Sequence, residues 1–183
     1  SYSSWHPPKN TNNSNPTSYI QTRANYFQPT QNDKVNIGNS ATWDGIIGND
    51  TGNGSTQKMT FAAWVLKWTN GAGAATGVLN SPRIFDFSND TFAYVLTNGQ
   101  LVFVVKWGSP GKNVYWISKD SVITNANGST ANARWYHMAI TYDANSVHNQ
   151  PRVYIDGQRV EMLLGQGTVE APYYGISTAY DCY

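Results

Sequence analysis

The chain has 183 residues, a length that suits one domain with arms, and charged residues make up 13% of it against roughly 25% in an ordinary soluble domain. The net charge is +1 and no basic block occurs, so the pattern that nucleic-acid binding requires is missing. No apolar run approaches the roughly 18 residues of a membrane span, and the abundance of Asn, Ser, Thr, Gly and Tyr is typical of a β-rich extracellular or particle-surface protein.

Residues 1–17, SYSSWHPPKNTNNSNPT, predict an irregular N-terminal arm, because prolines and small polar residues leave no hydrophobic periodicity. Short strands are predicted at Tyr19–Phe27 and Lys34–Ile37. A polar, glycine-rich loop follows over Gly38–Gln57 and offers Asp44, Asn49 and Asp50 as an oxygen cluster, although a solvated loop explains the same residues.

Strands then recur along the chain as far as Met162. Phe61–Trp68 is apolar at nearly every position, which predicts a strand buried on both faces. The further predicted strands are Arg83–Phe87, Thr91–Thr97, Leu101–Trp107, Val114–Ile117, Trp135–Tyr142, Val153–Ile155 and Gln158–Met162. Asn98-Gly99 predicts a type I′ hairpin and Asp156-Gly157 a second tight one. Many short strands at this spacing indicate an all-β sandwich or barrel over residues 18–170, followed by a C-terminal tail at 171–183.

Three motifs in this region resemble a known family. They are Phe61-Ala-Ala-Trp64-Val65, then Trp135-Tyr-His137-Met-Ala-Ile-Thr-Tyr-Asp143, and finally Tyr154-Ile-Asp-Gly157. In combination they resemble a laminin-G-like or pentraxin-like domain of the concanavalin A-like lectin and glucanase superfamily. The resemblance implies a two-sheet antiparallel β-sandwich of the concanavalin A-like jelly-roll type, with Trp64 and Trp135 in the core and His137 as a hydrogen-bonded scaffold residue.

The same resemblance implies a possible calcium site. In calcium-binding pentraxins, a pair matching Asn89-Asp90 holds the metal together with an acidic cluster after a Leu-Gly-Gln step, here Leu164-Gly165-Gln166. Only Glu170 stands near that second position, whereas calcium takes 6 to 8 oxygen ligands. The resemblance therefore implies either no cofactor or a weakly held calcium ion, and Asn89-Asp90 also suits a simple turn.

Catalytic residues are not predicted. Glycoside hydrolysis needs two carboxylates about 5–5.5 Å or 6.5–9.5 Å apart, and the turn expected at Ser88-Asn89 separates the nearest pair, Asp86 and Asp90. A glycoside hydrolase of the concanavalin-like fold is kept as the alternative function.

Aromatic side chains supply the candidate ligand-binding residues. Trp68 and Trp107 end strands beside glycine-rich turns, and the adjacent Tyr115 and Trp116 must point to opposite faces of a strand, so that only one of them can lie in the core. These aromatics predict either a sugar-stacking platform or a cover for an arm or a subunit interface.

The sequence thus predicts a non-catalytic surface module. It either binds a glycan or another cell-surface ligand, or serves as a virion or particle structural protein, such as a decoration, tail or fibre component, whose arms contact protein neighbours. The chain has one cysteine, Cys182, which is expected to be a free thiol near a frayed end, with an intermolecular bridge as the alternative. The last strand of the sandwich is expected to be very short, or to be replaced by an N-terminal strand or by a strand from a neighbour.

Overall fold

The computed structural model describes residues 36–39, 43, 57–67, 83–87, 90–107, 112–124, 134–169 and 181–182. Its contacts divide the chain into two units, Ser1–Asp33 and Lys34–Tyr183, and every described residue belongs to the second unit. The predicted arm at 1–17 and the predicted strand Tyr19–Phe27 lie outside the described residues. Within the described part of the chain, no helix is long and apolar enough to cross a membrane.

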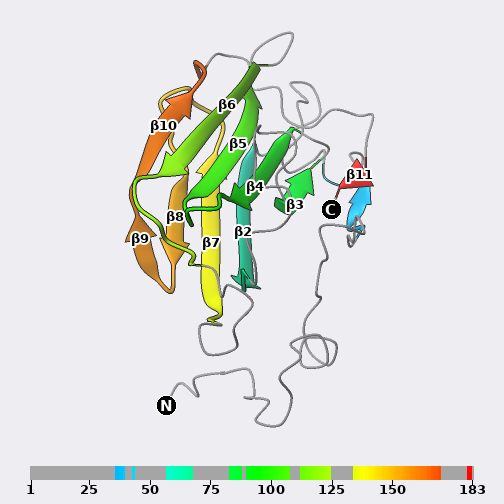
Figure 1. The fold of residues 1–183 in the computed structure, drawn as a ribbon. Helices are drawn as coiled ribbons and strands as arrows, with labels where there is room; N and C mark the ends of the chain where they lie inside the picture. The colour runs from blue at the N-terminus through cyan, green and yellow to red at the C-terminus, as the bar shows by residue number, and fades with distance from the viewer. Residues whose placement is uncertain are drawn as a thin grey trace, which may run out of the picture. The chain divides into compact units, whose positions relative to one another are not determined.

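The second unit is an all-β, two-sheet antiparallel sandwich, as predicted. The first sheet has seven strands in the order β1-β11-β3-β4-β5-β6-β10, and the second has four in the order β2-β7-β8-β9 (Figure 1). The strands are β1 Gly38–Asn39, β2 Lys58–Val65, β3 Arg83–Phe87, β4 Thr91–Val95, β5 Leu101–Trp107, β6 Lys112–Ser118, β7 Tyr136–Asp143, β8 Arg152–Ile155, β9 Gln158–Val160, β10 Met162–Gln166 and β11 Asp181–Cys182.

The core between the sheets is built from alternate residues of each strand. A chain of ring contacts runs through it from Phe61 to Phe85, Phe103, Trp116 and Tyr142, with centroid separations of 4.2 to 6.5 Å. Trp116 is the largest fully buried side chain. Rings at these separations pack edge to face or offset, and these aromatic contacts hold the two sheets together.

Among the described strands, β4 and β5 are buried on both faces and β2 is not. All side chains of Leu101–Val105 are buried, with Leu101, Phe103 and Val105 in the core between the sheets. Val102 and Val104 belong to a second apolar cluster on the other face of the seven-stranded sheet, together with Phe92 and Tyr94. Because both faces of β5 are buried, apolar side chains occupy every position of Leu101–Val105.

The prediction that Phe61–Trp68 is buried on both faces is wrong for β2. Met59 faces the core and Phe61 and Val65 pack against it, whereas Thr60, Ala62 and Trp64 point outward and are exposed. The outward neighbours on β7 are Ala139 and Thr141, and such small or polar side chains give the indole of Trp64 little apolar surface to pack on.

Both predicted hairpins form, but they differ in turn type. At Asp156-Gly157 both residues have positive φ, as a type I′ turn requires. At Asn98-Gly99 only Gly99 has positive φ, and its N–H donates to the Leu96 carbonyl oxygen at 3.0 Å. That arrangement is a longer loop, in which a type I turn is followed by a left-handed glycine, so the predicted type I′ turn is wrong here.

Two further segments differ from the sequence-based expectation. The predicted strand Gln158–Met162 divides at Glu161, because β9 belongs to the four-stranded sheet and β10 to the seven-stranded one. The backbone of Asp181–Cys182 forms β11 between β1 and β3, so the predicted C-terminal tail ends in a very short strand, which agrees with the expected short last strand and not with a frayed end.

Candidate functional site

The structure describes the side chains of two of the four aromatics predicted to bind a ligand, Tyr115 and Trp116. Trp116 is 1% exposed in the core, which removes it from the candidates because no ligand can reach its ring. Tyr115 lies on the opposite face of β6, half-buried against the second apolar cluster. Trp107 is described only as a backbone position of β5, and Trp68 lies outside the described residues.

Of the three candidate calcium ligands, the described residues include only Asp90. Its N–H donates to the Phe87 carbonyl oxygen at 3.1 Å, which closes a turn after β3, and its buried carboxylate accepts a hydrogen bond from Lys106 at 2.8 Å. Asn89 and Glu170 lie outside the described residues, as do Asp44, Asn49 and Asp50 of the polar loop. The part of the chain that the structure describes holds no cluster of three or more metal-binding side chains.

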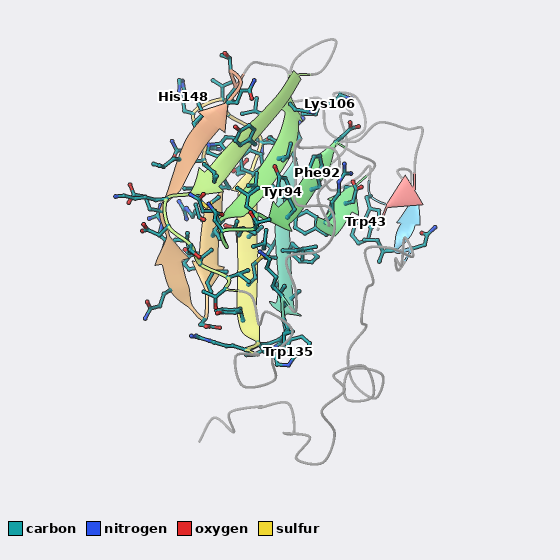
Figure 2. All side chains as sticks on the ribbon, viewed as in Figure 1. Trp43, Phe92, Tyr94, Lys106, Trp135 and His148 are labelled. Carbon is teal, nitrogen blue, oxygen red and sulfur yellow. The ribbon has the colours of Figure 1, made fainter. Side chains whose placement is uncertain are left out.

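A group of buried charges lies on the face of the seven-stranded sheet that carries the second apolar cluster. Asp86 is paired with Arg83, and the guanidinium of Arg83 lies 3.9 Å from the centre of the Phe92 ring. Figure 2 shows Phe92 and Tyr94 on β4, with Lys106 of the neighbouring β5 close by. Burial, and then the proximity of Tyr115, raise the pKa of Tyr94, while Arg83 partly opposes that shift. The carboxylates of Asp86 and Asp90 are thus each bound to a cation, and this side of the sheet is held by ion pairs among apolar rings.

The outward side of the four-stranded sheet is different, and we call it the Trp64 face. It consists of the outward side chains of β2, β7, β8 and β9, which are Lys58, Thr60, Ala62, Trp64, His137, Ala139, Thr141, Asp143, Arg152, Tyr154 and Arg159.

Trp64 dominates this face because 47% of its surface is exposed. His137 lies directly opposite it on β7, with the two rings edge to face at a centroid separation of 5.3 Å. This contact covers one side of the indole, and about half of the residue's surface stays in solvent. The prediction that Trp64 is a core residue is therefore wrong.

The next row across the sheet continues the face with small residues and a second aromatic. Ala62 lies opposite Ala139, Ala139 opposite Tyr154, and Tyr154 opposite Arg159. Tyr154 is thus two strands and one row from Trp64, which places their backbones about 12 Å apart at usual sheet spacings. The alanines between them add little bulk, so a ligand lying across the strands can contact both rings.

Asp156 anchors the end of this face. Its Oδ1 accepts a hydrogen bond from the His137 N–H at 2.9 Å, and its own N–H donates to the His137 carbonyl oxygen at 2.8 Å. Its Oδ2 is paired with Arg134, whose guanidinium lies 4.7 Å from the centre of the Tyr136 ring. The predicted scaffold role of His137 is thus carried by its backbone, while its ring supports Trp64.

An open depression of about 540 Å³ borders the face at β9. Its lining includes Asp120, Tyr136 and Arg159, together with the paired Arg134 and Asp156 and with Glu161, which accepts a hydrogen bond from Lys119 at 2.9 Å. Most of the charged side chains that line the depression are therefore paired. Arg159 belongs both to this lining and to the Trp64 face.

Sequence reasoning overlooked Trp64 even though a simple signal was present. Phe61 and Trp64 are three positions apart, and a strand places such residues on opposite faces. The motif therefore cannot bury both aromatics in one core. Trp135, also predicted for the core, is half-buried outside the core cluster at the start of β7 (Figure 2).

Comparison with protein-family models, with curated proteins and with solved structures finds no match to this chain. The fold and the candidate sites therefore depend on the sequence and the geometry described above.

Proposed function

We propose that this chain is a non-catalytic surface module that binds glycans through the Trp64 face. The observation that carries the proposal is a half-exposed tryptophan held edge to face by a histidine, with a tyrosine on the next row of a regular sheet. Sugars offer flat arrays of C–H groups to such rings, and their hydroxyls bond to neighbouring polar groups. Thr60, Thr141 and Arg152 supply those polar groups on the row beyond the alanines.

The chemistry of the face suits binding without hydrolysis. Its one carboxylate on a strand, Asp143, lies 3.5 Å from Lys58 and accepts a hydrogen bond from the Asn145 N–H at 3.0 Å. These contacts, the backbone bond first, lower the pKa of Asp143, so it is ionised at neutral pH and does not serve as a proton donor. The resemblance to concanavalin A-like lectins agrees with a binding role outside the cell or on a particle.

The proposal is tested by screening the full chain on a glycan array and measuring its strongest ligand by affinity electrophoresis. Trp64→Ala is expected to abolish most of the retention and Trp64→Phe to restore part of it. Leu164→Ala is the matched control, because Leu164 is a comparably exposed apolar side chain on the other sheet. Retention that survives Trp64→Ala unchanged would place the ligand elsewhere.

A second candidate function is a structural part of a virion or particle. Leu163 and Leu164 are 45% and 50% exposed on β10, the edge strand of the seven-stranded sheet, and exposed apolar edges pair with neighbouring chains. Analytical ultracentrifugation is expected to show an oligomer that dissociates in the Leu163→Glu variant. A monomer at high concentration would count against this candidate.

A further inference from the structure

We infer that the ligand of the Trp64 face is an acidic polysaccharide that carries carboxylate groups, an inference that rests on the proposed glycan-binding function. The observation behind it is a pair of exposed arginines, Arg152 on β8 and Arg159 on β9, which both adjoin Tyr154 on this face.

The register places these two cations close to one another. Tyr154 lies directly opposite Arg159, and Arg152 is two residues before Tyr154 on the same strand. Arg152 and Arg159 are therefore diagonal neighbours on one face of an antiparallel pair, with backbones about 7–8 Å apart. Like charges at this separation repel each other, and an anion between them removes the repulsion.

The described residues supply no such anion. Neither Arg152 nor Arg159 forms an ion pair within the part of the chain that the structure describes. Of the nearby acidic groups, Asp143 lies beside Lys58, Asp156 is paired with Arg134, and Glu161 with Lys119. Asp120 lines the depression together with Arg159 but forms no ion pair with it. The cationic end of the face is therefore left for a ligand.

The chemistry of the two groups specifies the kind of anion. A guanidinium presents its N–H donors in a planar fork that matches a carboxylate with two parallel hydrogen bonds. Both arginines adjoin Tyr154, and Trp64 lies further along the face, so two aromatic rings stand beside a pair of cations. This arrangement suits a polymer of uronic acid units, in which each sugar ring carries its own carboxylate.

The test measures binding of the full chain to polygalacturonate by isothermal titration calorimetry. Arg152→Gln/Arg159→Gln is expected to weaken binding about tenfold for each arginine removed. The matched control is Lys119→Gln, which removes one charge from an exposed cation that already has a partner; it is compared with each single arginine variant and is expected to change binding less than threefold. Near-UV circular dichroism checks that the arginine variants and the control keep the native packing.

The outcomes separate this inference from the proposed function. If the arginine variant loses polygalacturonate but keeps a neutral glycan that depends on Trp64, both stand. If a Trp64-dependent neutral glycan binds and polygalacturonate does not, glycan binding stands and the acidic ligand is refuted. If dextran sulfate or single-stranded poly(dT) bound as tightly as polygalacturonate, the acidic-polysaccharide inference would also be refuted, because charge density alone would then determine the affinity. If no glycan depends on Trp64, the proposed function fails first.

Discussion

Replacing Trp64 with alanine tests whether this tryptophan belongs to the surface, as the structure places it, or to the core, as its motif suggests. About half of the side chain is already in solvent, and its one described ring partner is His137. A tryptophan presents about 200 Å², so the truncation returns roughly 100 Å² or less to water. At ~25 cal/mol per Å², that area corresponds to at most about 2.5 kcal/mol, and burial already present in the unfolded chain lowers the expected loss of unfolding free energy to about 1.5–2 kcal/mol.

Trp116→Ala is the internal comparison because Trp116 is fully buried and contacts both Phe103 and Tyr142. Truncating a core tryptophan costs about 3–5 kcal/mol, since a cavity remains in addition to the lost transfer free energy. Urea unfolding followed by far-UV circular dichroism measures both variants, with the m-value reporting whether the transition stays comparable.

The expected order is the smaller loss for Trp64→Ala and a loss larger by about 1 kcal/mol or more for Trp116→Ala. Equal losses in the two variants would refute the outward placement of Trp64, and with it the Trp64 face.

Three further predictions concern stability. Gly99→Ala is expected to cost about 1–3 kcal/mol in urea unfolding, because Gly99 has φ +87° and an added Cβ would lie 2.7 Å from the Ile123 carbonyl oxygen. Gly157→Ala is the control, because Gly157 also has positive φ but its added Cβ would meet no atom within 4 Å. Equal losses in the two variants would show that the close contact at Gly99 does not matter. Lys106→Met is expected to cost about 2–4 kcal/mol, because it removes the ammonium group that is paired with the buried Asp90 carboxylate. Adding Asp90→Asn to this variant should recover part of the loss, and no recovery would mean that the two side chains are not coupled. The Asn145 N–H and Lys58 lower the pKa of Asp143. The ionised carboxylate therefore stabilises the fold above the usual pKa near 3.8, and this stability disappears as the pH falls through the lower folded value. Asp143→Asn should flatten the decline in melting temperature below pH 4, and an unchanged profile would contradict this assignment.

Much of the sandwich could be predicted because alternation and turn chemistry are local signals. The strands Arg83–Phe87 and Leu101–Trp107 have the bounds that the sequence predicts, and the Asp156-Gly157 turn has the positive φ values that its residues allow. The division at Glu161 could not be seen, since a chain that passes from one sheet to the other stays extended and keeps its alternating pattern.

The candidate site was harder to predict because burial depends on what lies over each face. An apolar run such as Phe61–Trp68 resembles a doubly buried strand, yet the described strands buried on both sides are β4 and β5, in the middle of their sheet. The exposure of Trp64 depends on the small side chains that β7 places beside it, and that pairing joins residues more than 70 positions apart. Motif resemblance assigned this tryptophan to the scaffold, whereas the period of two places it outside.

The most direct test of glycan binding by the Trp64 face is an NMR titration that follows the indole N–H signals of the chain, with the signal of Trp64 identified by its loss in Trp64→Ala. Adding the strongest array ligand is expected to shift the Trp64 indole signal in a saturable way, with Trp116 unaffected because its ring is buried. Saturation of the protein with a glycan while the Trp64 signal stays in place would contradict the proposed function.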